Sequence, residues 1–143
     1  MAITEEHTEL IDRVWEEAIE KGEMAVVDEA VANDYVLHTP ASPEPIRGPE
    51  GLKQYKRTLR EAFPDISVTI EDRVVGEESV VDRYRMRGTH EGDFNGIAPT
   101  GTEVEFTGII IHHLEDGKAV EDVVEFDIFG LMQQLGVVEA PGE

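Results

Sequence analysis

The chain has 143 residues, enough for one domain over residues 1–143 with a buried core. It lacks cysteine, which excludes disulfides, zinc–thiolate sites and cysteine nucleophiles. With 32 acidic and 12 basic residues the net charge is −20, which disfavours nucleic acids and anionic membranes as partners because their phosphates would be repelled.

The N-terminal third is predicted to be helical. Apolar residues recur at helical spacing over residues 5–20, with Thr4 as a candidate N-cap and Gly22 beyond the end. A second short helix covers 23–32, and a short strand covers 35–38. Residues 39–48 hold three prolines and a glycine, which predicts an irregular loop at the mouth of a pocket. A third helix covers 49–62, with Pro49 in its first turn.

The remaining chain is predicted to form a sheet. Apolar and polar residues alternate over 66–70, 80–86, 103–114 and 119–127. The turns lie near Gly76 and Asp116, and a long Gly-rich loop covers 88–101. Sequential strands joined by turns predict an antiparallel sheet, and helices that precede strands predict an α+β fold with the helices on one face. A short helix that ends at Gly136 closes the chain.

Five segments occur in an order typical of a known family. They are YVLH (35–38), RGPEG (47–51), AFPD (62–65), RGTHEGDFNGIAPTG (87–101) and EDVVEFDIFGLMQQLG (121–136). In these segments the chain resembles the SnoaL-like polyketide cyclases of the nuclear transport factor two superfamily. The resemblance implies a cone-shaped, curved antiparallel sheet packed against N-terminal helices and enclosing an apolar pocket. It also implies a homodimer paired through the sheets.

Asp127 is the first candidate for a catalytic residue. It matches the aspartate that acts as acid and base in the family, and Phe126, Ile128 and Phe129 place it among apolar neighbours. The alternative is a surface aspartate that caps the helix beginning after it. Family members carry His-Trp ahead of this aspartate, where this chain has Asp122 and Val123. The missing tryptophan suggests a smaller ligand, and Asp122 is expected to point outward.

The histidines supply the other candidates. His112 and His113 are adjacent, so a strand would direct them to opposite faces. Counting from Ile109 and Ile111 favours His113 as the catalytic pocket residue, with His112 as the alternative. His38, in a His-Thr-Pro sequence, and His90 are candidate substrate-binding residues, although each could instead hold a loop in place. The pocket wall is further expected to include Tyr35, Phe94 and Val123.

The resemblance implies a cofactor-free acid/base enzyme that closes a ring in a small apolar or polyketide-like ligand by an aldol-type reaction. In this hypothesis Asp127 removes a proton from carbon, and His113 or His38 supports the enolate oxygen. A hydrolase or isomerase, or a non-catalytic small-ligand-binding protein, are the alternatives. The sequence contains no nucleotide-binding motif and no HxH or HxxxH spacing, so neither a cofactor nor a metal is expected.

The strong acidity has two interpretations. Adaptation to high salt explains it best, since salt screens self-repulsion while a carboxylate surface stays hydrated. An ordinary acidic protein is the alternative. The N-terminal residues MAITEEHTEL lack the basic and then apolar layout of a secretory signal, so a cytoplasmic protein is expected.

Overall fold

The computed structural model describes residues 2–138 and begins with three helical elements. Helix α1 (Glu5–Arg13) runs directly into a π-helical segment, η1 (Val14–Glu20), and α2 (Ala25–Ala30) follows. Thr4 is the N-cap of α1, as predicted. The predicted helix over 5–20 is therefore present, but its second half winds more widely than an α-helix. Helix α2 ends earlier than predicted because residues 31–38 are already extended.

The middle of the chain supplies an edge of the sheet and the longest helix. Strand β1 (Val31–His38) pairs antiparallel with the short β2 (Ile46–Arg47), which lies inside the segment predicted to be irregular. Helix α3 (Gly48–Ala62) follows at once and has Pro49 in its first turn, as predicted. Gly48 has a φ of 73°, a left-handed conformation that glycine adopts without strain at the junction between β2 and α3.

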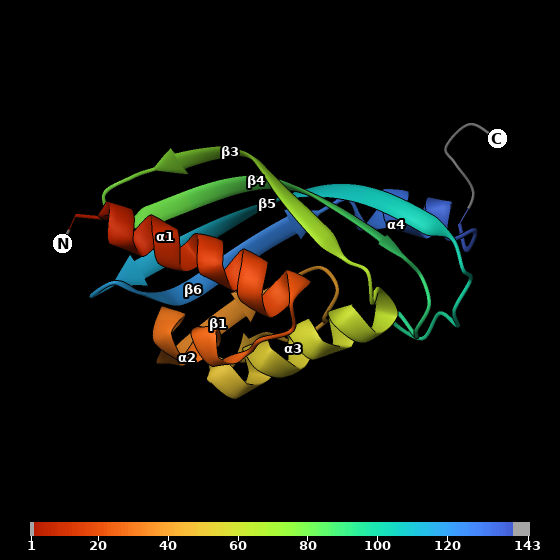
Figure 1. Cartoon of the computed structure of the whole chain (residues 1–143), viewed down its shortest axis with the longest axis horizontal. Coiled ribbons are helices and arrows are strands. Elements are labelled where there is room, and N and C mark those ends of the chain that lie inside the picture. The colour runs from red at the N-terminus through yellow and green to blue at the C-terminus, as the bar shows by residue number, and fades with distance from the viewer. Residues whose placement is uncertain (1, 139–143) are drawn as a thin grey trace.

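Four long strands complete the sheet, and their arrangement can be followed in Figure 1. They are β3 (Ser67–Val75), β4 (Ser79–Thr89), β5 (Glu103–Glu115) and β6 (Lys118–Phe126), and α4 (Ile128–Gln134) follows them. The strand order is β2-β1-β6-β5-β4-β3. Strands β3 to β6 form the predicted antiparallel meander, whereas β1 pairs parallel with β6. The sheet is mixed because the chain crosses over through α3 and the meander before β6 returns beside β1.

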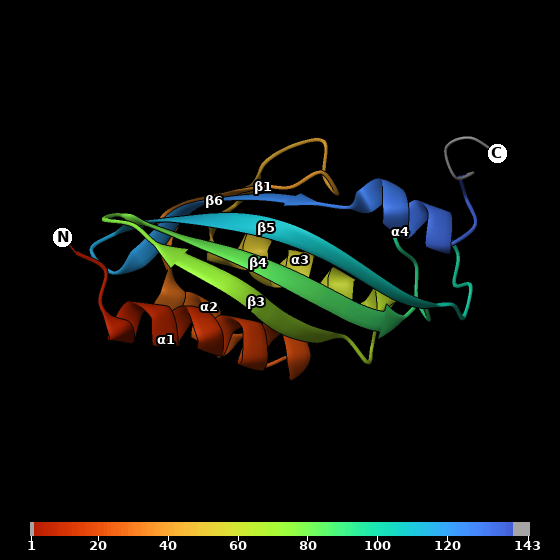
Figure 2. The same ribbon diagram turned by 90° about the horizontal axis from the view of Figure 1, so that it is seen from above.

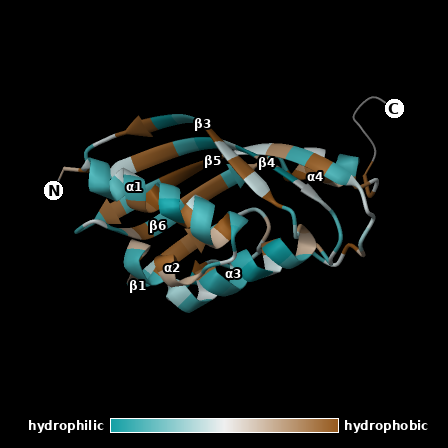
Figure 3. Ribbon diagram, in the orientation of Figure 1, coloured by the Kyte–Doolittle hydropathy of each residue, from teal (hydrophilic) through white to brown (hydrophobic). Residues whose placement is uncertain are grey.

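The sheet curves around the helices and does not close on itself (Figures 1 and 2). Helices α1, α2 and α3 cover one face, which we call the inner face, and hydrophobic residues of the strands and helices gather there (Figure 3). Along β5 the buried residues alternate with more exposed ones, so Ile110 is 8% exposed while Ile109 is 47% exposed. The predicted α+β fold with a curved sheet and N-terminal helices is confirmed. No helix within residues 2–138 is long and apolar enough to cross a membrane.

Candidate functional site

Two adjoining cavities lie between the inner face of the sheet and the helices. Five residues line both of them: Trp15, Leu52, Lys56, Ile110 and Asp122. The first cavity extends toward α1 and the second toward the aromatic side chains of Phe94, Phe106 and Phe126. The room for water-sized spheres is about 50 Å³ in the first and 60 Å³ in the second, so each holds only a few waters or a small organic group.

Asp122 carries a buried carboxylate to the junction of the two cavities. It lies on β6 and is 6% exposed. The Tyr35 hydroxyl on β1 donates a hydrogen bond of 2.5 Å to Oδ2, and His112 Nδ1 on β5 lies 2.8 Å from Oδ1. His112 stands directly opposite Asp122 in the β5–β6 pairing, and β1 flanks β6 on the other side. Three neighbouring strands therefore fix one carboxylate from both sides.

His112 lies between two carboxylates. Its Nε2 is 3.3 Å from Oδ2 of Asp82, a β4 residue with no exposed surface. Burial works against a charged imidazole, but Asp122 and Asp82 together raise the pKa of His112 to about 9. At neutral pH the ring is therefore an imidazolium whose two N–H groups donate to the two carboxylates.

Asp82 is held in turn by two further donors. Arg73 on β3 donates to Oδ1 at 2.6 Å and to Oδ2 at 3.0 Å, and Trp15 Nε1 donates to Oδ2 at 3.1 Å. Burial opposes the charged carboxylate, yet the hydrogen bonds from His112 and Arg73 keep the pKa of Asp82 well below its usual range. Arg73 also pairs with the exposed Asp12 on α1 at 2.8 Å. We call the continuous set from the surface to the cavities the polar network: Asp12, Arg73, Asp82, His112, Asp122 and Tyr35.

The π-helical segment places Trp15 at this network. Its ring packs against Tyr84 with centroids 5.1 Å apart, while its N–H reaches Asp82. Arg60 on α3 closes the end of the segment by donating to the carbonyls of Ile19 and Glu20, at 2.7 Å each. Single turns of π-helix occur frequently at functional sites, and here the wider turn carries a residue that lines both cavities.

Lys56 adds a second cationic side chain to the cavities, besides His112. It lies on α3, is 9% exposed and lines both cavities. Burial lowers the pKa of Lys56 to about 8, while the charge of Asp122 acts in the opposite direction. Within residues 2–138 its ammonium group has neither a hydrogen bond nor an ion pair. In the same part of the chain no group of three or more His, Asp or Glu side chains is arranged to hold a metal ion.

The structure places Asp127 away from both cavities. Strand β6 ends at Phe126, and the exposed Asp127 is the N-cap of α4, where its Oδ1 accepts a hydrogen bond of 2.9 Å from the Gly130 N–H. It borders a shallow surface depression next to Glu125. The expected position in an apolar pocket is wrong, because the inward row of β6 is Asp122, Val124 and Phe126, so residue 127 would face outward even if the strand continued. The capping alternative describes the observed geometry.

His113 and Val123 lie on the outer face of the sheet. His113 Nδ1 is 3.0 Å from the Ser79 hydroxyl, and neither residue lines the two cavities. Counting from Ile109 and Ile111 selected the wrong face, because Ile110 is the isoleucine that packs inward. His112, kept as the alternative, is the one of the adjacent pair that lines the first cavity. The expectation that Asp122 points outward, away from Val123, is wrong because Asp122 belongs to the inward row of β6 with Val124.

The remaining sequence candidates divide into two groups. Tyr35 and Phe94 line the second cavity, where they were expected. His38 is partly exposed and pairs with Glu121 at 3.0 Å, outside both cavities. His90 is fully buried, and its Nδ1 accepts the Thr100 N–H at 3.2 Å, which holds the 88–101 loop. For His90 the loop-holding alternative therefore matches the structure.

Three residues of the site escaped the sequence reasoning, although the sequence carried a signal for each. Asp82 alternates with Val80 and Tyr84 in an otherwise apolar row of β4. Lys56 lies four residues after Leu52, on the apolar side of α3. Asp122 lies two residues before Val124, in the inward row of β6. A charged residue at a core position of an amphipathic element is the pattern that indicates a buried polar site.

Comparison with known proteins assigns the chain to a family. The family model of the SnoaL-like polyketide cyclases matches residues 9–135. A search of curated proteins found no match. Among solved structures, IdmH from Streptomyces antibioticus, a candidate polyketide cyclase, is 30% identical, with a TM-score of 0.77 over 92% of this chain and 99% of its own.

Two further structures show the same architecture. TsrD from Streptomyces laurentii is 27% identical, with a TM-score of 0.85 over 95% of this chain and 99% of its own. A candidate SnoaL-like polyketide cyclase from Jannaschia sp. CCS1 is 22% identical, with a TM-score of 0.85 over 96% of this chain and 99% of its own, which is a likeness of fold. The chain belongs to the SnoaL-like polyketide cyclase family.

Proposed function

We propose that this protein is an acid/base enzyme that closes a ring in a small polyketide-like molecule by an intramolecular aldol reaction, with Asp122 as its base. The observation that carries this proposal is the position of the Asp122 carboxylate, buried where two largely apolar cavities meet and fixed by Tyr35 and His112. Burial removes this carboxylate from water, which costs free energy, and a carboxylate buried in a cavity despite that cost is a candidate for proton transfer.

Asp122 performs both proton transfers in the proposed reaction. Its carboxylate removes a proton from a carbon flanked by carbonyl groups and leaves an enolate. The enolate carbon then attacks a second carbonyl of the same molecule, and the resulting alkoxide takes the proton back from Asp122. The product is a cyclic hydroxyketone isomeric with the substrate. Because the carbon is already acidic, general base catalysis of about 10²–10⁴-fold together with positioning is sufficient.

Tyr35 and His112 keep the Asp122 carboxylate in one orientation. Tyr35 stays a neutral donor, because burial and the charge of Asp122 raise the pKa of its phenol well above the usual range. The imidazolium of His112 is held by Asp82, which in turn is fixed by Arg73. We assign Arg73 and Asp82 as positioning residues, because neither lines a cavity.

The walls of the cavities favour a small and mostly apolar substrate. Leucine, isoleucine and aromatic side chains make up most of the lining, and they exclude water from the reacting atoms. The limited free volume is consistent with a ligand smaller than a polycyclic polyketide.

The test compares two carboxylates that the sequence alone does not separate. Exchange of the acidic C–H of small 1,3-diketones with deuterium oxide is followed by NMR for the wild type, Asp122→Asn and Asp127→Asn. We expect Asp122→Asn to lose at least about 10²-fold in the enzyme-catalysed rate, and Asp127→Asn to retain it. Full exchange activity in Asp122→Asn would overturn the assignment of the base. Exchange without ring closure on longer polycarbonyl substrates would instead indicate an isomerase.

A further inference from the structure

Lys56 presents a buried charge that has no direct hydrogen-bonding partner, although the charge of Asp122 acts on it. Its ammonium group has no hydrogen bond or ion pair within the described residues, although its side chain is more than nine-tenths buried. An isolated cation away from water is costly unless another charge or several acceptors compensate for it. The neighbouring lysine on the same helix is different, since Lys53 pairs with Asp28 at 2.8 Å and Glu50 at 3.0 Å.

The position of Lys56 ties this charge to the site. Lys56 and Asp122 line both cavities, so a molecule that fills either one meets both side chains. The other residues common to the two cavities are Trp15, Leu52 and Ile110, whose side chains offer no acceptor for an ammonium group. The remaining common residue, Asp122, carries an acceptor but makes no hydrogen bond or ion pair with Lys56, so an oxygen of a ligand between the two side chains would be the direct acceptor.

We propose that Lys56 is the oxyanion-binding group of this site and that its ligands are acidic 1,3-dicarbonyl compounds, bound as enolates with an oxygen at Nζ. This inference rests on the proposed function and adds to it the substrate class and a second residue that touches the substrate. Lys56 takes the place that the sequence hypothesis gave to His113 or His38, neither of which lines the cavities.

The charges favour an enolate over a permanent anion. A dicarbonyl compound enters without net charge, and its proton moves to Asp122 as its own oxygen becomes negative. The negative charge beside Lys56 thus moves from the Asp122 carboxylate to the substrate oxygen, and the net charge of the site stays the same. An anion that carried its charge into the site would meet Asp122 while that carboxylate is still ionised. A donor that binds more tightly as the enolate forms lowers the barrier rather than only the dissociation constant.

The surroundings of Lys56 fit a delocalised, singly charged group on an apolar body. Phosphate esters are bound by several converging donors, often arginines or backbone N–H groups. Here one ammonium group faces cavities with mainly apolar walls. The ammonium form that the proposal needs is the main one at neutral pH, since burial lowers the pKa of Lys56 only to about 8.

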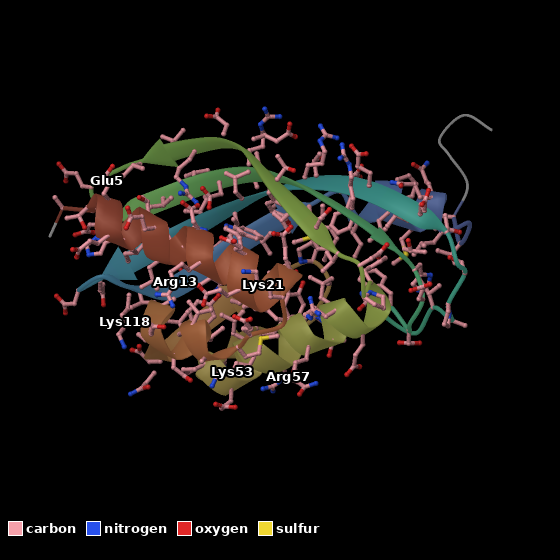
Figure 4. The ribbon with its side chains drawn as sticks, viewed as in Figure 1. Glu5, Arg13, Lys21, Lys53, Arg57 and Lys118 are labelled. Atoms are coloured by element: carbon pink, nitrogen blue, oxygen red, sulfur yellow. The ribbon has the colours of Figure 1, made fainter. Side chains whose placement is uncertain are left out.

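Binding of cyclohexane-1,3-dione, which is an enolate in neutral water, tests the proposal by calorimetry in an Asp122→Asn background, where no ionised carboxylate opposes the anion. Cyclohexanone is the uncharged probe of similar shape. We expect Lys56→Met to weaken binding of the dione by about tenfold to a hundredfold, the range of a hydrogen bond to a charged group. Cyclohexanone binding should change less than about twofold. Lys53→Met is the matched control, because Lys53 points away from the sheet on the same helix (Figure 4), and it should leave both affinities unchanged.

A second pair of variants separates this proposal from the assignment of the base. Asp122→Asn removes a negative charge next to the enolate, so it should bind the dione at least as tightly as the wild type while losing C–H exchange. If Asp122→Asn kept its exchange activity, the assignment of Asp122 as the base would be overturned, while the binding of the dione by Lys56 would not be affected. If Lys56→Met and Lys56→Gln in the Asp122→Asn background, both folded by circular dichroism, bound the dione like Asp122→Asn alone, the role of Lys56 would be overturned and that of Asp122 would stand.

A covalent role for Lys56 gives a distinct result. If its amine formed an imine with the dione, water would be released and borohydride would reduce the C=N bond to a stable secondary amine. Mass spectrometry after such treatment should find unmodified Lys56, because the proposed contact is a hydrogen bond. A dione adduct on Lys56, absent from Lys56→Met, would overturn the non-covalent assignment.

Discussion

His112 and Asp122 face each other across β5 and β6, and Nδ1 of the histidine lies 2.8 Å from Oδ1 of the aspartate. On its other side the same ring is 3.3 Å from Asp82. A histidine between two carboxylates holds its proton tightly, so it serves to orient Asp122 rather than to exchange protons with solvent. Asp122 is therefore the group in this pair that is free to act on a ligand.

Asp82→Asn tests the orienting role of the polar network. The substitution keeps the shape of the side chain but removes one of the two charges that stabilise the imidazolium, so the pKa of His112 should fall from about 9. NMR titration of the His112 ring measures this change. The C–H exchange rate at saturating substrate should fall about tenfold or more with little change in KM, since Asp82 lines neither cavity.

Asp12→Asn provides the control for this experiment. Asp12 pairs with Arg73 at 2.8 Å but is largely exposed, so both the His112 titration and the exchange rate should stay close to those of the wild type. An unchanged exchange rate in Asp82→Asn, together with a lowered pKa of His112, would show that the charge of the imidazolium does not support the reaction.

The raised pKa of His112 also predicts how stability depends on pH. The folded value of about 9 lies above the ordinary 6.5, so His112 stabilises the fold fully below pH 6.5 and loses this contribution as the pH rises through 9. The loss is on the order of 3 kcal/mol in the free energy of unfolding. The charged groups that act on the ring are Asp122 and Asp82, and the titratable His7 and Lys56 line the same cavity.

The contribution of Lys56 to stability changes with pH in the opposite direction, because its folded pKa of about 8 lies below the ordinary 10.5. Its destabilising effect is complete below pH 8 and disappears toward pH 10.5. Urea unfolding between pH 6 and 9.5 is therefore best measured in a Lys56→Met background. A further His112→Asn substitution should flatten the profile, and an equally steep profile without His112 would contradict its assignment.

Asp127→Ala should reduce stability without affecting the chemistry. The substitution removes the hydrogen bond of 2.9 Å from the Gly130 N–H to the Asp127 carboxylate at the start of α4. Loss of such a cap destabilises by about 1 kcal/mol, which urea unfolding resolves. Asp127→Asn, which retains a capping oxygen, should recover most of this loss. A large drop in exchange rate at unchanged stability would restore the role that the sequence suggested for Asp127.

The elements were predictable because their patterns are long and local. Strand β5 alternates over its whole length, and Pro49 in the first turn of α3 marks its start correctly. The parallel pairing of β1 with β6 was not predictable in this way, because it joins segments separated by the whole meander. The wider winding of η1 depends on tertiary contacts such as that of Arg60 with the Ile19 carbonyl.

The site was harder to predict because it depends on which face of each strand is buried. An error of one residue at Ile109 moved the expected histidine from His112 to His113. The same kind of error on β6, where Val123 and Asp127 were assigned to the pocket row, directed Asp122 outward. Tyr35 and Phe94 line the second cavity, and their position depended less on the face of a strand because large aromatic side chains tend to be buried. The homodimer, the cytoplasmic location and the adaptation to high salt stay predictions.

Lys56→Met should stabilise the unliganded protein. Methionine has nearly the length of lysine and fills the same space without a buried charge, so the free energy of unfolding should rise by about 3 kcal/mol at pH 7. Because the cost comes from the ammonium form, the gain should shrink as the pH passes 8 and vanish near 10.5, the ordinary value for a lysine. Lys53→Met instead breaks the ion pairs with the exposed carboxylates of Asp28 and Glu50, so it should change the free energy of unfolding by less than about 1 kcal/mol at pH 7 and at pH 10.5. Urea unfolding of the wild type, Lys56→Met and Lys53→Met at pH 7 and at pH 10.5 measures these differences. If Lys56→Met were as stable as the wild type at pH 7, the ammonium group would already be compensated within the protein, and the reason to expect an anionic oxygen beside it would be lost.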